Sequence, residues 1–460
     1  MELIKDGDVV VLQRHNYMRA QKLNAAKNCF VQLARDNIEL LNIIGHPYGS
    51  AFKMVPHETK KKLWKVELTS EITDFETLFL GENEPSGEDN RNITDSKNSA
   101  QGLKRDQIEA MKEEQMDGKE IVGQLIENSA SFHQKTKFSQ AKFLKKKAQK
   151  YFQYLIIKKP SIRLLMQINY KNDPMKMMNL RIDTLAQILN NSNVRSGGKY
   201  LVYETGCQGM IVASVLERLG NAGKLVHIYQ TGSPQTQSLS AMNFGDDADK
   251  TNLMHTINMY HLRALEQGKD ITHMHGKSTE NNEKPVVPFR QKQREESIKT
   301  YDLIKSRQMD GLIIACKQHP TNTLLALIKY LAYSRPFVVY SPYKEPLMDA
   351  YVAIKDTGKT VMVTLTETWL RNYQVLPSRS HPEVLMSGIE IEFYFMGDVK
   401  IPSYFQVVED TFYLAFTLTI QILLAAIMEA QRRLKRMKEV TRRKCVFNDA
   451  NNLCNLHSSE

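Results

Sequence analysis

A strand, a glycine turn, a helix and a second strand follow one another between residues 199 and 229, and this order constrains the fold most. Residues 199–204 (KYLVYE) have the pattern of a buried strand, residues 211–219 that of an apolar helix, and residues 224–229 that of a second strand. Such a unit is typical of a doubly wound parallel sheet, in which a crossover helix returns the chain to the next strand. We therefore expect an α/β, Rossmann-like domain over residues 173–388.

The remaining sequence divides into segments that differ in hydrophobicity and charge. Short alternating apolar runs separated by turn residues predict a small β-rich, barrel-like domain over residues 1–80. Residues 81–106 are polar and nearly free of large apolar side chains, as in a disordered loop. We expect residues 107–172 to be a helical basic linker. We interpret residues 243–298 as an insertion in the α/β domain, and residues 389–460 as an atypical hydrophobic and basic tail.

Composition excludes several classes of protein and site. The hydrophobic content of 42% and the charged content of 25% are typical of a globular protein. The N-terminus lacks a signal-peptide layout, and the five scattered cysteines include no CxxC pair. We therefore expect a reducing compartment, without a disulfide framework or a zinc module. His273 and His275 have no acidic or thiol partner at ligand spacing, so we expect no metal site.

Positive charge is concentrated between residues 128 and 172. This segment holds ten lysines and one arginine but no Asp or Glu, whereas the whole chain has a formal net charge of +11. Apolar residues at three- and four-residue steps predict a helix, with Thr136 or Ser139 as its N-cap and with lysines on another face. The apolar stripe consists of Ala141, Leu144, Ala148, Tyr151 or Phe152, and Leu155, and the cationic stripe of Lys142, Lys146 and Lys150.

A polyanion is the natural partner of this cationic stripe, because neutralised phosphates release condensed counterions. Interspersed aromatic residues predict possible stacking on unpaired bases. The alternative is an ordinary solvated helix face or a nuclear-import signal. The stacking candidates are Phe138, Phe143, Tyr151 and Tyr154, and the candidate RNA-binding lysines are Lys135, Lys137, Lys142, Lys145, Lys146, Lys147 and Lys150.

The glycine turn after the first strand lacks parts that a methyl-donor site needs. Rossmann-like methyltransferases hold S-adenosylmethionine with several glycines in this turn and a carboxylate at the end of the second strand. Glu204 and Gly206 fit that pattern, but Gln208 and Met210 stand where further glycines are expected, and Gln230 ends the second strand. We expect the Met210 side chain to occupy the cofactor's space and no cofactor to bind. The alternative is an ordinary tight connection between strand and helix.

Long blocks of residues 1–388 resemble, in the expected order, the family of non-catalytic subunits of the eukaryotic tRNA (adenine-58-N1)-methyltransferase. The resemblance implies a degenerate methyltransferase domain in a nuclear heterotetramer of two such subunits and two catalytic ones. This chain would bind tRNA, and its partner would supply cofactor and catalysis for T-loop methylation. The blocks are ENSASFHQKTKFSQAKFLKKKAQKY, NLRIDTLAQILNNSNVRSGGKYLVYETGCQGM, DGLIIACKQHPT, SRPFVVYSPYKEPL and TETWLRNYQVLPSRSHPEVLMSG.

The resemblance also bears on individual residues. Active relatives carry an Asp after the fourth strand, but the matching position here is Ala315 and the next carboxylate is Glu345, so no general base is implied. Further candidates for contact with tRNA or with the partner subunit lie in two later blocks. Pairing inside the domain is the alternative for these residues, which are Arg371, Arg379, His381, Tyr343 and Lys344.

Beyond Gly388 the sequence departs from the family pattern. A closing strand is expected there, and its absence would leave a sheet edge exposed. Thr411–Met428 is an uncharged stretch of 18 residues, which fits a buried or partner-packing helix, a membrane anchor or a variant C-terminus. We expect no obligatory membrane partner. The rival functions are a self-sufficient, divergent S-adenosylmethionine-dependent RNA methyltransferase and a membrane-tethered variant.

Overall fold

The computed structural model describes most of the chain up to Lys400. Five of the expectations above lie outside the described residues: most of the loop 81–106, Phe152, the pair His273 and His275, Arg379, and the segment Thr411–Met428. The described residues are 2–15, 17–27, 29–33, 36–57, 63–70, 87, 101–113, 116, 118–151, 154–230, 232–244, 248–271, 288–375, 380–383 and 391–400.

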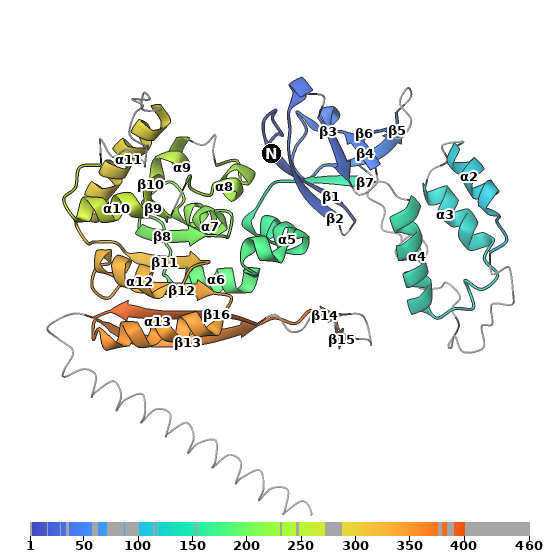
Figure 1. The fold of residues 1–460 in the computed structure, drawn as a ribbon. Helices are drawn as coiled ribbons and strands as arrows, with labels where there is room; N and C mark the ends of the chain where they lie inside the picture. Colours follow the sequence, from blue (N-terminus) through green and yellow to red (C-terminus); the bar gives the residue numbers. More distant parts are fainter. Residues whose placement is uncertain are drawn as a thin grey trace, which may run out of the picture. The chain divides into compact units, whose positions relative to one another are not determined.

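The N-terminal part forms a seven-stranded sheet that nearly closes on itself, in the order β2-β1-β7-β5-β6-β4-β3 (Figure 1). Its two edge strands meet where the Arg19 guanidinium donates a 2.7 Å hydrogen bond to the Gln32 carbonyl. This confirms the β-rich, barrel-like domain. The strands are β1 (Val9–Arg14), β2 (Tyr17–Lys22), β3 (Phe30–Leu33), β4 (Asp36–Glu39), β5 (Ala51–Pro56), β6 (Leu63–Thr69) and β7 (Tyr154–Lys158).

Strand β7 corrects the expectation of a helical linker throughout residues 107–172. Helix α4 ends at Tyr151, and β7 then pairs antiparallel with both β1 and β5 before the helix at residues 162–172 begins. Leu155 and Ile157 are buried in the core of the N-terminal sheet. Their spacing of two residues is that of a strand, so Leu155 does not belong to the predicted helical stripe. The N-terminal sheet therefore depends on a strand that follows it by more than 80 residues.

Among the described residues between β6 and β7, three helices share a hydrophobic core of their own. They are α2 (Arg105–Glu113), α3 (Gly118–Glu127) and α4 (Lys137–Tyr151). The core is built mainly from one face of α3, from Phe132 in the connection, and from the inner face of α4. Its buried members are Ile121, Val122, Leu125, Ile126, Phe132, Leu144 and Tyr151.

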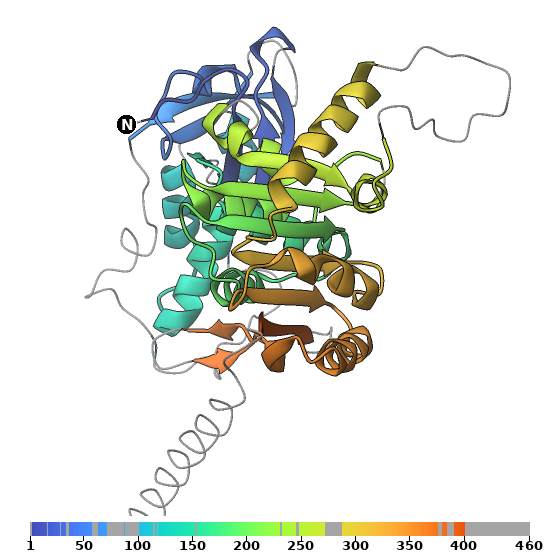
Figure 2. The same ribbon diagram turned by 90° about the vertical axis from the view of Figure 1, so that its left-hand side faces the viewer.

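The second sheet has the order β10-β9-β8-β11-β12-β16-β13, and Figure 2 shows its strands side by side. Five neighbouring strands, β10 to β12 in that order, run parallel, and β16 runs antiparallel to β12. This confirms the doubly wound α/β fold. The strands are β8 (Lys199–Thr205), β9 (Lys224–Tyr229), β10 (Met254–Asn258), β11 (Gly311–Cys316), β12 (Pro336–Ser341), β13 (Thr360–Trp369) and β16 (Ile391–Val399).

Helices connect the strands of this sheet, and a short hairpin of β14 (Tyr373–Gln374) and β15 (His381–Pro382) follows β13. The α-helices are α5 (Ile162–Asn172), α6 (Ile182–Asn191), α7 (Met210–Leu219), α8 (Gln237–Ala241), α9 (Ala248–Leu253), α10 (Met259–Glu266), α11 (Pro288–Ile304), α12 (Thr321–Leu327) and α13 (Lys344–Asp356). The described part of the chain also contains the 3-10 turns Ala25–Lys27, Leu41–Ile43, Pro174–Met177 and Ile328–Tyr330.

Two expectations about this sheet were wrong. The segment 243–298 is not simply an insertion, because its residues 254–258 form the edge strand β10, which has only two buried side chains and therefore a weak apolar signal. The closing strand is also present. Residues 391–399 form β16, which lies between β12 and β13 and buries both Tyr394 and Phe395, so the hydrophobic pattern does not alternate.

Candidate nucleic-acid interface and glycine turn

Helix α4 packs one face against α3 and leaves the other face to solvent. Leu144 is fully buried and Tyr151 nearly so, which confirms these two members of the predicted apolar stripe. Gln140 is also buried, and its side-chain amide donates a 3.0 Å hydrogen bond to the Phe132 carbonyl. These contacts fix the rotation of α4 about its axis and thereby decide which of its side chains remain outside.

The predicted lysines of α4 lie mainly on the outer face. Lys137 and four others are exposed, whereas Lys147 is half-buried, and both burial and the charge of Lys150 lower the pKa of the Lys147 ammonium. Among the described residues, no carboxylate forms an ion pair with any lysine from Lys142 to Lys150. The outer face is therefore an uncompensated cationic row. The exposed members of this row are Lys142, Lys145, Lys146 and Lys150.

The aromatic residues near these lysines face inward, so the predicted stacking platforms are wrong for most of them. Phe143 packs edge-on against Phe132 with ring centroids 5.4 Å apart, and the Lys147 ammonium lies 5.1 Å from the Phe143 centroid. Tyr151 is 8% exposed, and Tyr154 packs against the same core. The helix period places Phe143 and Tyr151 on the side of Leu144, whereas Tyr154 reaches this core from the start of β7.

The other predicted contact residues lie on different elements. Lys135 is half-buried in the connection before α4, and its backbone N–H is bonded to the Phe132 carbonyl. Arg371 is exposed after β13, beside the exposed apolar residues Trp369 and Tyr373. The sequence analysis did not predict this apolar exposure at the end of β13 and the start of β14.

The glycine turn between β8 and α7 is closed by a side chain of the same chain. Gly206, Gln208 and Gly209 all have positive φ angles, of 109°, 57° and 76°. This conformation brings the backbone N–H groups of Gly206 and Gln208 together, and both donate to the Gln235 Oε1, at 3.0 and 3.2 Å. The donors that such a turn offers to a ligand are therefore already satisfied.

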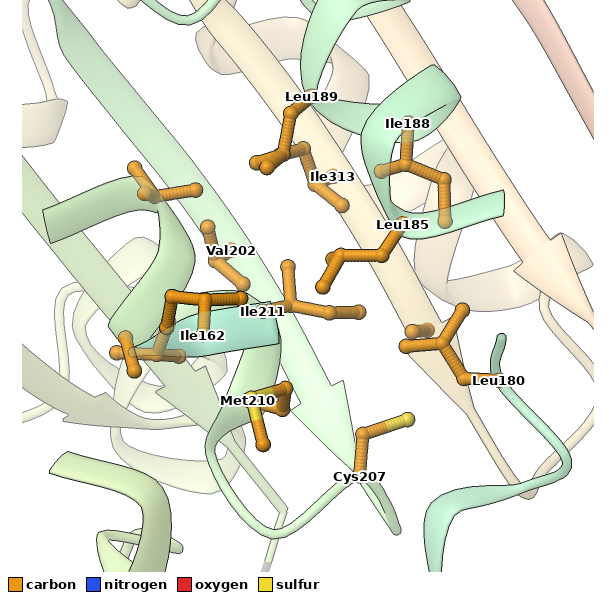
Figure 3. Packing of buried hydrophobic residues seen from close by; sticks show 14 of the residues in the cluster. Ile162, Leu180, Leu185, Ile188, Leu189, Val202, Cys207, Met210, Ile211 and Ile313 are labelled. Atoms are coloured by element: carbon orange, nitrogen blue, oxygen red, sulfur yellow. The ribbon is translucent and has the colours of Figure 1, made fainter. Parts of the chain in front are cut away.

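Side chains from two other segments also lie against Gly206. A Cβ atom placed on Gly206 would stand 2.7 Å from the Lys317 Cε and 2.8 Å from the Met178 Sδ. The expectation that Met210 fills this space was wrong, because Met210 begins α7 and is fully buried in the core with Ile162 (Figure 3). Sequence reasoning missed Gln235, Lys317 and Met178, and no local motif marks them.

Glu204 at the end of β8 serves the fold rather than an open site. It is 1% exposed, and its Oε2 accepts a 3.0 Å hydrogen bond from the Val212 backbone N–H in the first turn of α7. Burial raises the pKa of this carboxyl to about 7, although the backbone N–H groups at the start of α7 oppose the shift. On the adjacent strand, Ala315 pairs with Glu204 and offers only a methyl group.

Other residues of interest lie apart from the turn. Gln230 is exposed directly after β9, and Glu345 is exposed in the first turn of α13. His227 on β9 is fully buried, and burial lowers the pKa of its imidazole to about 4. Within the described part of the chain, no three His, Cys, Asp or Glu side chains gather as they would around a metal ion, and no helix has the length and apolarity of a membrane span.

Comparisons with known proteins identify relatives of this chain. A model of the Gcd10p family matches residues 3–297. The tRNA (adenine(58)-N(1))-methyltransferase non-catalytic subunit of Mus musculus is 34% identical over 442 residues, which cover 84% of this chain and 86% of that protein. The protein of the same name from Dictyostelium discoideum is 30% identical over 413 residues, which cover 84% of this chain and 77% of that protein. A solved structure of the tRNA methyltransferase TrmI from Aquifex aeolicus is 11% identical, covers 87% of this chain and 100% of that chain, and has a TM-score of 0.42.

Proposed function

Because the chain belongs to the Gcd10p family, we propose that it is the non-catalytic subunit of a tRNA (adenine-58-N1)-methyltransferase. In this role it binds tRNA and supports a catalytic subunit, which supplies the methyl donor and performs the chemistry. The proposal includes a nuclear heterotetramer of two such subunits and two catalytic ones.

The glycine turn carries the non-catalytic part of the proposal. In a donor-binding turn the backbone N–H groups face the ligand, but here Gln235 accepts from both of them. Binding a donor would require breaking these hydrogen bonds and moving the side chains of Lys317 and Met178 away from Gly206. A donor molecule would therefore have to compete with an acceptor that the chain already supplies, so the closed turn disfavours the cofactor.

The RNA-binding part of the proposal rests on α4. Its outer face presents Lys142, Lys145, Lys146 and Lys150 without ion-pair partners among the described residues, and such a row gains free energy by releasing counterions from phosphates. The completed sheet supports the assembly, because β16 covers β12 and leaves no gap between the parallel strands and β13. The α/β domain can therefore act as an intact scaffold for the catalytic partner.

Two measurements test this function. Isothermal titration of the purified chain with S-adenosylmethionine should give no saturable heat, whereas the complex with the catalytic subunit should bind the donor. Methylation of tRNA should require both subunits. Saturable donor binding by the isolated chain, abolished by substituting Gly206 with Val, would support the rival self-sufficient methyltransferase. Light scattering of the complex should give the mass of two subunits of each kind, with 52.9 kDa contributed by each copy of this chain.

A further inference from the structure

The lysine row of α4, which consists of Lys142, Lys146 and Lys150, lowers the stability of the free protein. Lys142 and Lys146, and again Lys146 and Lys150, stand four residues apart on one face, and α4 contains no acidic residue. Like charges at this spacing destabilise a helix by about 0.2–0.5 kcal/mol for each pair. An anion that lies along the row removes this repulsion, so the surface is suited to an extended polyanion.

The exposed side chains of α4 are of one chemical kind. Among those that the structure describes, every fully exposed side chain of the helix is a lysine. Most groups that could read or stack bases are turned away, because Phe143 and Tyr151 pack in the core and the Gln140 amide donates to the Phe132 carbonyl. Phe138, in the first turn of α4, remains half-exposed. An ammonium group contacts phosphates as a point charge and does not distinguish one base from another.

The row is also rigid and straight. Lys142, Lys146 and Lys150 are successive turns of one helix, so their Cα atoms span about 12 Å at 1.5 Å per residue. A paired RNA region holds its phosphates in fixed positions, whereas a flexible single strand must lose conformational freedom to follow the row. Single strands are usually held by several stacked aromatic rings. Among the described side chains on this face, only the half-buried Phe138 in the first turn of α4 is aromatic.

We infer that α4 binds the phosphate backbone of a paired RNA region and does not read unpaired bases. This inference rests on the proposed function and deepens it, because it assigns α4 to a stem of the RNA substrate and not to a loop. Contacts of this type position the RNA without selecting its sequence. Recognition of the methylated loop then falls to other surfaces of the complex.

The test uses the complex of the full chain with its catalytic subunit and three probes: tRNA, a fully paired RNA hairpin, and an oligouridine of the same length. The variant carries glutamine at three positions of the lysine row. Glutamine has a helix propensity close to that of lysine, so the substitutions remove charge without weakening the helix. A control variant removes the same charge from exposed lysines elsewhere. The row variant is Lys142→Gln, Lys146→Gln and Lys150→Gln, and the control is Lys292→Gln, Lys299→Gln and Lys359→Gln.

For the row variant we expect roughly 10- to 100-fold weaker hairpin binding at low salt, and a slope of log affinity against log salt that is smaller by about 2–3. A hairpin of scrambled sequence should lose affinity equally, and oligouridine should lose much less. The control variant should bind like the wild type. An equal or larger loss on oligouridine, or unchanged hairpin binding, would overturn the inference. If tRNA binding and methylation persist in that case, the proposed function stands. A wild-type complex that fails to bind tRNA would instead refute the proposed function.

Discussion

Replacing Glu204 with Gln should remove a pH-dependent loss of stability. Burial raises the pKa of this carboxyl from 4.5 to about 7, so the native state holds the proton more tightly than the unfolded state. Its contribution to stability is therefore full below about pH 4.5 and is lost as the pH rises through 7. A difference of 2.5 pH units (7 − 4.5) corresponds to about 3 kcal/mol at 1.36 kcal/mol per unit.

The glutamine retains a carbonyl oxygen that can accept the hydrogen bond from the Val212 N–H, so the substitution changes the ionisation more than the geometry. Urea unfolding of the wild type and of Glu204→Gln should be compared at pH 5 and pH 8. We expect the stability of the variant relative to the wild type to increase by about 2–3 kcal/mol between these values. His227 titrates in both proteins, and its contribution cancels in the difference. A relative stability that stays constant with pH would refute the assignment of a buried, ionisable carboxyl at the start of α7.

Three further predictions follow from other contacts. Gln235→Ala should lower the free energy of unfolding by about 1–2 kcal/mol and speed amide exchange at the Gly206 turn, whereas Gln235→Glu, which keeps an acceptor, should protect the turn. Burial lowers the pKa of His227 from 6.5 to about 4, so the free energy of unfolding of the wild type should decrease as the pH is lowered from 6.5 to 4. The His227→Leu variant should lack this pH dependence. An equal pH dependence of urea unfolding in the two proteins would contradict the prediction. Lys146→Gln removes two like-charge pairs and should raise the melting temperature at low salt but hardly at high salt; a lower melting temperature would show that the row is not repulsive.

Local patterns predicted the elements whose signals are strong. The glycine turn with its flanking strands predicted the doubly wound sheet, and the run of lysines predicted α4, since helical periodicity and charge are readable from adjacent residues. Hydrophobic periodicity did not predict the strands β7, β10 and β16. Leu155 also fits a helical stripe, β10 buries few side chains, and β16 is buried on both faces, so none of the three alternates clearly with solvent.

The sequence by itself determined the chemistry that is present: a cationic segment without acids, and a turn short of glycines with Ala315 and Gln230 where active relatives are expected to carry acids. Only the tertiary structure decided how these parts are used. The packing of α4 on α3 separated the lysines from the aromatic rings, and Gln235, Lys317 and Met178 met at Gly206 from segments far apart in the chain. Contacts of this kind depend on how strands and helices stack, because side chains brought together by folding need no shared pattern along the sequence.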